Sequence, residues 1–127
     1  MYIQAADALV VVAASEQTGE EFNARYNAGM LYREDGMLAQ ASEQFMHALK
    51  LKPDEVRMIS ELALLKQDQG AVQEAERLYR RATAVDPKDA DNHYNLGNLM
   101  LSLDRPVEAV ATYSKAVRVM GLECADG

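Results

Sequence analysis

The chain repeats itself with a period of 34 residues, and this period constrains the fold more than any other feature of the sequence. Three sets of side chains fall into register: Ala41, Ala75 and Ala109; Phe45, Tyr79 and Tyr113; Ala48, Ala82 and Ala116. Three units follow, at residues 22–55, 56–89 and 90–123, with a lead of residues 1–21 and a tail of residues 124–127. A repeat of this length predicts a stack of similar supersecondary units rather than a single globule.

Each unit has the pattern of two helices. The first helix ends near a glycine, Gly36 or Gly70, because glycine accepts the left-handed backbone that terminates helices. In the third unit, residues 104–106 (Asp-Arg-Pro) take this place, and the proline can begin the next helix. The second helix carries Ala, an aromatic residue and Ala on one face, and it ends before Pro53 or Pro87. A generic helical bundle is the alternative, and the register across three units disfavours it.

These motifs resemble the tetratricopeptide repeat, whose pattern contains Leu-Gly and Tyr, then Ala, an aromatic residue and Pro. The first unit has Ala28, Gly29 and Tyr32 at the leading positions, and the third has Leu96 and Gly97. The second unit is looser there but keeps the later residues of the pattern. The resemblance implies an all-α protein, a right-handed α-solenoid of antiparallel helix pairs with seven helices, including an extra N-terminal helix.

Charge and composition exclude several classes of partner. Thirteen Lys and Arg stand against 20 Asp and Glu, a net charge of −7, so we expect no nucleic acid as partner. No apolar stretch reaches the length of a membrane span, and we expect no membrane partner. The single Cys excludes a disulfide framework and suits a reducing compartment, so we expect a cytoplasmic protein.

The sequence shows no catalytic constellation, so we expect neither an enzyme nor a cofactor. His47 and His93 lie far apart in the repeat frame, and Cys124 has no His nearby. Residues 86–93 hold three Asp and a His but lack the glycine and final Glu of a calcium loop, so we expect a turn and a helix start, and no metal. Three of the seven methionines are expected to pack rather than to form an adaptable surface: Met46, Met58 and Met100.

Both ends of the predicted array are apolar. Residues 3–17 have the pattern of a lone helix, like the second helix of a missing unit, so residues 1–21 would cap the first unit or mediate oligomerisation. This helix is apolar almost all round, whereas a surface helix is apolar on one side. The last helix, near residues 106–120, is expected to expose Val107, Val110, Val117 and Val119 in part. We hypothesise a homo-oligomer through one of these ends; a truncated array is the alternative.

The resemblance implies that the first helices of successive units line a concave groove, where a peptide or helix of another protein binds. Thirteen residues are expected to contact this partner: Asn23, Tyr26, Asn27, Met30, Arg33, Arg57, Ser60, Glu61, Leu64, Asp91, Tyr94, Asn95 and Asn98. One branch of the family grips acidic C-termini with Lys, Asn and Arg at five of these positions. Tyr26, Met30, Leu64, Tyr94 and Asn98 stand there in this chain, which excludes a cochaperone of that type. The acidic groove favours neutral, apolar or basic segments.

A Tyr-Asn pair recurs at equal positions of this groove, as Tyr26-Asn27 in the first unit and Tyr94-Asn95 in the third. In the second unit Glu61 takes the position of the Asn. In the branch related to sugar-transferring enzymes, an Asn at this position holds the peptide backbone. An amide suits this task because it donates and accepts hydrogen bonds at once. The alternative is that Asn is simply common before Leu-Gly in such repeats.

The sequence therefore predicts a non-catalytic adaptor or scaffold that binds a segment of another protein. Two rival functions stay open. The first is a small chaperone of the same family for secreted translocator proteins, which fits the acidic charge and the three repeats, although the chain is short for that group. The second is the docking part of a larger protein.

Overall fold

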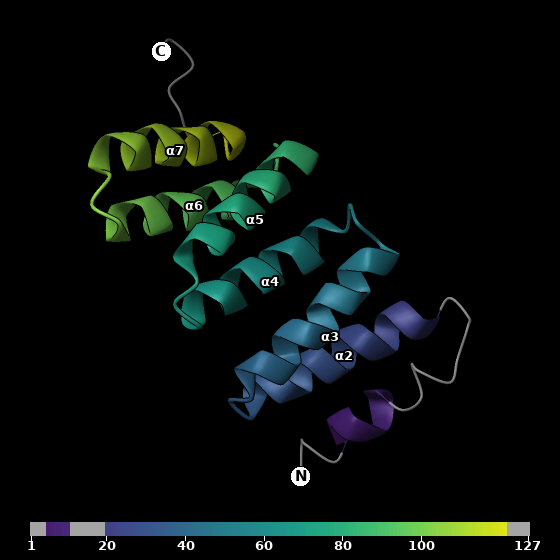
Figure 1. The fold of residues 1–127 in the computed structure, drawn as a ribbon. Coiled ribbons are helices and arrows are strands. Elements are labelled where there is room, and N and C mark those ends of the chain that lie inside the picture. Colours follow the sequence, from purple (N-terminus) through teal and green to yellow (C-terminus); the bar gives the residue numbers. More distant parts are fainter. Residues whose placement is uncertain (1–4, 11–19, 122–127) are drawn as a thin grey trace.

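The structure, a computed structural model, describes residues 5–10 and 20–121. The labelled helices follow in chain order as α2 (Glu20–Glu34), α3 (Leu38–Leu51), α4 (Val56–Asp68), α5 (Val72–Val85), α6 (Ala90–Ser102) and α7 (Pro106–Val119) (Figure 1). Residues 5–10 are helical as well. The secondary structure of the described residues is thus entirely α-helical, as the sequence predicts.

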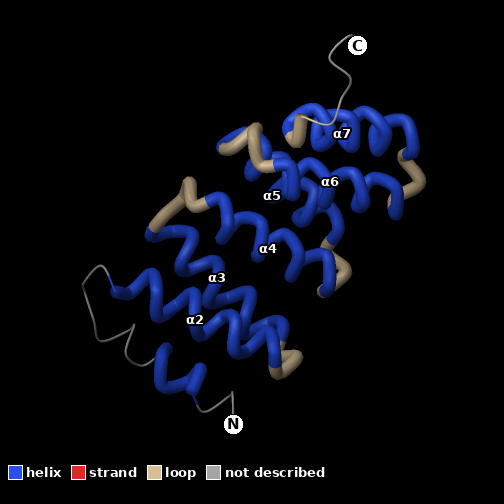
Figure 2. The backbone as a smooth tube through the Cα atoms, turned by 180° about the vertical axis from the view of Figure 1, so that it is seen from behind, coloured by secondary structure: helices blue, strands red, loops and turns tan. Residues whose placement is uncertain are grey.

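Consecutive helices pair into three hairpins, α2–α3, α4–α5 and α6–α7, which follow one another along an elongated stack. Seen from behind in Figure 2, the hairpins keep the same order, and short loops join the helices. Neighbouring hairpins touch where α3 packs on α4 and where α5 packs on α6. A single hairpin leaves one apolar face open, and stacking covers it, so the fold is the predicted solenoid.

The three hairpin turns share one geometry, including the turn that has no glycine. Gly36, Gly70 and Asp104 stand 34 residues apart and have φ angles of 78°, 82° and 59°. After each turn a backbone N–H donates to the carbonyl five residues earlier, in the Schellman pattern: Met37 to Tyr32, Ala71 to Lys66 and Arg105 to Met100. Asp visits the left-handed region more easily than most residues, so the third turn survives the loss of glycine. Pro106 begins α7, as predicted.

The repeated Ala–aromatic–Ala face of the second helices forms the core. Six of these side chains have no exposed surface: Ala41, Phe45, Ala48, Ala75, Tyr79 and Ala82. Met58 and Met100 are buried too, as expected. Met46, however, is 45% exposed, so the prediction that it packs is wrong. It directly follows Phe45, and one residue turns a side chain by about 100° around a helix, away from the buried face.

The N-terminal helical residues pack against the first hairpin. Ala6 is fully buried in a cluster with residues of α2, α3 and α4, and Leu9 lies against the same cluster. The hydroxyl of Tyr32 donates a hydrogen bond to Asp7. This bond, together with burial, raises the pKa of Tyr32 from 10.0 to about 12. The rest of the predicted helix lies outside the described residues, so its capping or oligomerising role stays a prediction.

The last helix exposes the apolar residues that the sequence singled out. The four valines of α7 are all exposed, from Val107 at 82% to Val119 at 37%. A next unit of the solenoid would cover such a face. The predicted self-association through this end stays a prediction, and residues 124–127 lie outside the described part of the chain.

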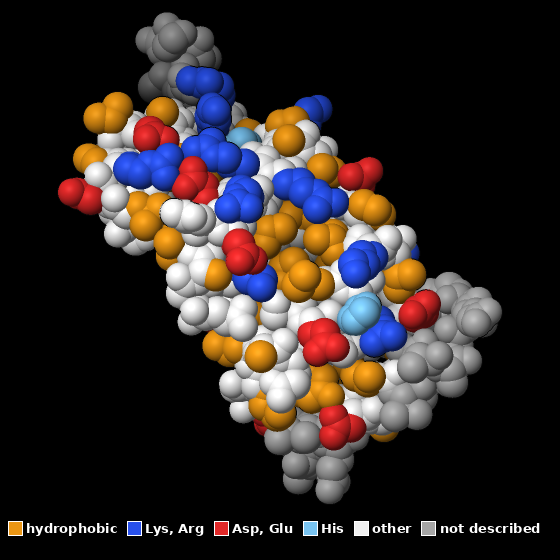
Figure 3. Space-filling view, in the orientation of Figure 1, with side chains coloured by type: hydrophobic (Ala, Val, Ile, Leu, Met, Phe, Trp, Pro, Cys, Tyr) orange, Lys and Arg blue, Asp and Glu red, His pale blue; other side chains and the backbone are white. Residues whose placement is uncertain are grey.

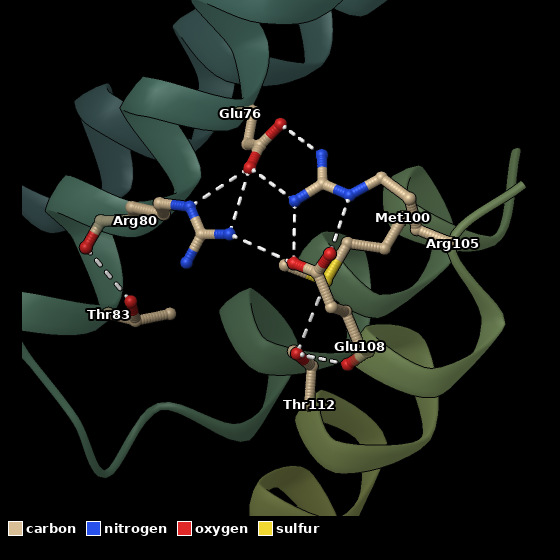
Figure 4. A network of polar contacts seen from close by, with 7 residues as sticks. All are labelled: Glu76, Arg80, Thr83, Met100, Arg105, Glu108 and Thr112. Atoms are coloured by element: carbon tan, nitrogen blue, oxygen red, sulfur yellow. Dashed lines mark hydrogen bonds and ion pairs between the residues drawn. The ribbon is translucent and has the colours of Figure 1, made fainter. Parts of the chain in front are cut away.

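A network of charged side chains fastens α5 to the start of α7 (Figure 4). Arg105 donates to both carboxylate oxygens of Glu76, at 2.8 and 3.1 Å, and to Glu108 at 2.6 and 3.0 Å. Arg80 donates to the same Glu76 from one turn further along α5, at 2.8 and 3.0 Å. The bonds from Arg105, and then those from Arg80, hold the pKa of Glu76 below its usual value. The network therefore ties the second hairpin to the third.

Candidate binding surface on the first helices

The thirteen residues predicted to bind a partner lie on α2, α4 and α6, the first helices of the three hairpins. We call the surface formed by these residues the A-face. Five of them are exposed: Asn23, Asn27, Arg57, Asp91 and Tyr94. Eight are half-buried: Tyr26, Met30, Arg33, Ser60, Glu61, Leu64, Asn95 and Asn98. Their use as one peptide groove stays a prediction.

The two tyrosines of the A-face stand at the same repeat position, and each rests on an aromatic ring of its own hairpin. The ring of Tyr26 lies 6.1 Å from that of Phe45, and the ring of Tyr94 lies 5.7 Å from that of Tyr113. The two tyrosines differ, however, in what covers the rest of each ring. Tyr94 is 56% exposed, whereas the guanidinium of Arg57 lies 5.9 Å above the ring of Tyr26. The third hairpin therefore presents more aromatic surface than the first.

The supporting rings fit because the facing helix has a glycine. A Cβ added at Gly29 would lie 2.4 Å from Cε1 of Phe45, and one added at Gly97 would lie 2.7 Å from Cδ1 of Tyr113. Carbon atoms in contact need about 3.5–4.0 Å. The glycines thus set the depth of the two rings, and the rings in turn support the tyrosines of the A-face.

An ion pair crosses the boundary between the first and second hairpins on this face. Arg33 of α2 lies 2.7 Å from a carboxylate oxygen of Glu61 and 4.0 Å from one of Asp68, both on α4. Arg33 is therefore already paired with carboxylates of the chain itself. An acidic ligand gains little from it, because it would have to displace them.

The polar side chains of the A-face fall into two groups. The Asn98 amide accepts a hydrogen bond from the Tyr113 hydroxyl, and the Ser60 hydroxyl contacts Asn92, so these groups serve the fold. The side-chain amides of Asn27 and Asn95 make no hydrogen bond to other described residues, and neither does that of the exposed Asn23. Asn27 and Asn95 are distinguished by their equal positions in the first and third hairpins, and both amides are available to a ligand.

Asn92 lies outside the thirteen predicted residues, although it connects two repeats. It is 1% exposed, and its hydrogen bond with Ser60 joins α6 to α4. The signal in the sequence is its spacing of four residues from Leu96 and seven from Leu99, which places all three on one helix face. Because Asn92 also belongs to the acidic stretch of residues 86–93, which has the composition of a turn, this helical spacing is easily overlooked.

The described residues offer no group of three or more His, Cys, Asp and Glu that could hold a metal ion. His93 is buried, and its Nε2 lies 2.8 Å from the carbonyl oxygen of Pro87, so it links α6 to the preceding turn. Among the described helices, none has the length and apolar character to cross a membrane.

Comparison with known proteins identifies the repeat. Sequence profiles of the tetratricopeptide repeat match residues 22–55 and 60–120. Protein O-mannosyl-transferase TMTC3 of Homo sapiens is 24% identical over 115 residues, which cover 79% of this chain and 13% of that protein. The Mus musculus protein of the same name is 23% identical, with 79% and 12% covered. The chain spans about an eighth of the length of these curated relatives.

Solved structures show the same fold at low sequence identity. A tetratricopeptide repeat protein from Parabacteroides merdae matches with a TM-score of 0.86 and 20% identity, over 93% of this chain and 46% of that one. MamA from Desulfovibrio magneticus RS-1 matches with a TM-score of 0.83 and 17% identity, over 98% and 69%. The two profile matches together cover most of the sequence, and the structure buries the repeated alanines of the second helices together with Phe45 and Tyr79. The chain belongs to the tetratricopeptide repeat family.

Proposed function

We propose that this chain is a non-catalytic interaction module that binds an extended peptide segment of a partner protein along the A-face. Tetratricopeptide repeats are interaction modules, and one observation carries the finer assignment. The amides of Asn27 and Asn95 occupy equal repeat positions and make no hydrogen bond to other described residues. Each amide can donate to and accept from one peptide unit, as recognition of an extended backbone requires.

The rest of the A-face supports this function by contact area and charge. Tyr94 offers a largely exposed ring, and Met30 and Leu64 add half-buried apolar surface beside the amides. The A-face itself contains two cations and two carboxylates, and the helices α2, α4 and α6 as a whole contain six Asp and Glu against four Lys and Arg. Neutral or basic segments are therefore the better ligands, because complementary charge favours their encounter and disfavours acidic ones.

The test starts from peptides selected on the wild-type chain from a random display library. Affinities are then measured by fluorescence anisotropy for the wild type and for Asn27→Ala plus Asn95→Ala. Each lost amide removes one or two hydrogen bonds of about 1 kcal/mol each, so we expect the double variant to bind roughly 10- to 100-fold more weakly. The matched control is Gln40→Ala plus Gln73→Ala, which removes two exposed amides from the second helices α3 and α5.

Unchanged affinity of the asparagine variant, or an equal loss in the glutamine control, would refute binding through these amides. A second candidate is the docking part of a longer protein, because the match to the mannosyl-transferases covers a small share of their length. Sequencing the complete reading frame distinguishes the two, since a docking part would be continuous with further domains.

A further inference from the structure

A hollow of about 510 Å³ lies on the side of the molecule formed by the second helices, between α3 and α5 and above α4. Its apolar lining consists of Met46, Leu49, Pro53, Leu62 and Leu78. Its charged lining consists of Lys50, Lys66, Arg77, Arg81 and Glu74. Figure 3 shows this side, where a patch of hydrophobic side chains is flanked by Lys and Arg. None of these ten residues belongs to the A-face.

The charge of the hollow opposes that of the whole chain. Four cations and one carboxylate line it, in a protein whose net charge is −7. The same bias extends along the second helices. α3, α5 and α7 contain six Lys and Arg against four Glu, the reverse of the balance in α2, α4 and α6. The two sides of the solenoid therefore favour ligands of opposite charge.

Two of the four cations lack a partner within the described residues. Lys66 lies 3.4 Å from Glu74, and Arg81 donates to the carbonyl of Pro53. The side chains of Lys50 and Arg77 make no hydrogen bond or ion pair with any other described residue. They come from α3 and α5, on either side of the hollow, and both are exposed. A ligand carboxylate can pair with them without displacing an existing one.

The exposed apolar lining indicates that the ligand also carries apolar groups. Met46, at the rim on α3, is 45% exposed, whereas Leu49 and Leu62 below it are buried. Met adapts its shape to the side chains that it contacts, so it suits a rim that must accommodate a ligand. An exposed apolar patch with a polar rim is typical of a docking surface.

A second hollow lies one repeat further along the same side. Its volume is about 470 Å³, and Pro87 and Lys115 line it. These residues stand 34 positions after Pro53 and Arg81, so the pairing of proline and cation follows the repeat. A ligand longer than one hairpin can therefore use both hollows, which favours a peptide over a compact molecule.

We propose that the hollow between α3 and α5 binds an acidic amphipathic segment of a partner protein. Apolar side chains of the segment enter beside Met46, and its carboxylates pair with Lys50 and Arg77. This surface is separate from the A-face, so the proposal does not rest on the amides of Asn27 and Asn95. The chain would then hold two partners of opposite charge on its two sides.

The probe is a synthetic helical peptide with Leu at helical spacing i, i+3, i+4 and i+7 and Glu on the remaining face. A peptide with Lys in place of every Glu is the charge control. Both are titrated into the isotopically labelled full chain and followed by nuclear magnetic resonance. We expect the acidic peptide to shift the signals of Met46, Leu49 and Leu78, and the basic peptide to leave them unchanged.

Variants separate a local contact from the overall charge. Lys50→Glu plus Arg77→Glu exchanges two attractions for two repulsions, so we expect at least about a tenfold loss of affinity for the acidic peptide. Lys52→Glu plus Lys88→Glu changes the net charge equally at exposed sites that belong neither to the hollow nor to the A-face, and we expect less than about a threefold loss. Met46→Gln, at an exposed position, tests the apolar contact and should weaken binding several-fold.

Three results would overturn the proposal. The first is no shift at about 1 mM acidic peptide, the weak end of specific recognition. The second is equal loss of affinity in the two charge-reversal variants, since binding would then follow net charge alone. The third is that dodecanoate, an apolar chain with one carboxylate, shifts these signals while the peptide does not. That result would assign the hollow to a small amphiphile.

Discussion

Adding one methyl group at Gly29 tests how tightly the first hairpin is packed. In Gly29→Ala the new Cβ would lie 2.4 and 2.5 Å from two ring carbons of Phe45, more than about 1 Å inside normal contact distance. Phe45 has no exposed surface and lies between Ala41 and Ala48, so its ring has no free space to enter. Overpacking of this kind costs about 1–3 kcal/mol, and the better helix propensity of Ala returns about 1 kcal/mol. We expect a net loss of up to about 2 kcal/mol in the free energy of unfolding.

The same change in the third hairpin is the matched control. In Gly97→Ala the nearest ring carbons of Tyr113 lie 2.7 Å from the new Cβ. Tyr113 is half-buried, however, and can turn toward solvent at the cost of its hydrogen bond to Asn98. The overpacking cost and the gain in helix propensity then nearly cancel, so we expect a net change within about 0.5 kcal/mol.

Urea unfolding followed by far-ultraviolet circular dichroism measures both variants, with linear extrapolation to water. A double-mutant cycle completes the test. Phe45→Leu makes room for the new methyl group, so Gly29→Ala should cost at least about 1 kcal/mol less in that background than in the wild type. A stabilising effect of Gly29→Ala, or strict additivity with Phe45→Leu, would refute the contact between the glycine and the ring.

Three further predictions concern the turns and the charged contacts. Asp104→Gly should raise the free energy of unfolding by about 0.5–1 kcal/mol, because glycine adopts the left-handed φ of 59° without strain; a loss of stability in urea unfolding would contradict this. Glu76→Gln should lower stability at neutral pH by about 1 kcal/mol, since it weakens the bonds from Arg105. Because the folded-state pKa of Glu76 is lowered, its contribution is present above the pKa of the unfolded chain and disappears as pH falls through the folded value. The wild-type urea midpoint should therefore fall more steeply toward acid than that of the variant. In Tyr32→Phe the loss of stability between pH 10 and about 12 should be smaller than in the wild type. The hydrogen bond to Asp7 raises the folded-state pKa of Tyr32, and its contribution is lost as pH rises through that range; equal losses in alkaline urea titrations would contradict this.

The fold could be predicted because its core residues and its turns repeat in the sequence. The buried alanines and aromatic residues recur every 34 positions, and the stacking of hairpins follows from their apolar faces. The third hairpin turn is harder to predict from the sequence, because Asp104 takes the left-handed position where the pattern of the other two units has a glycine. The neighbouring Pro106 was the clue that a helix begins there, and α7 does begin at this residue.

The contacts between repeats could not be predicted to the same degree. The pairing of Arg33 with Glu61 joins residues 28 positions apart, and it depends on side-chain conformations rather than on a pattern. The contact of Asn92 with Ser60 is hard to predict because the sequence around Asn92 has the composition of a turn. Residue type alone predicts that Met46 packs in the core, whereas its position beside Phe45 turns it outward. Residue type predicts burial only when the helix face is known.

Helix α4 connects the two surfaces, because each of them uses a different side of it. Glu61 and Leu64 belong to the A-face, whereas Leu62 and Lys66 lie in the hollow between α3 and α5. Between these sides, Leu65 and other buried residues of α4 pack into the core on both hairpins, so the helix has little freedom to shift. A ligand on one surface can influence the other by moving α4, or by moving α2 against α3 or α6 against α5, and closely packed helices resist such shifts. The geometry therefore favours two surfaces that bind independently, as a protein that holds two partners together requires.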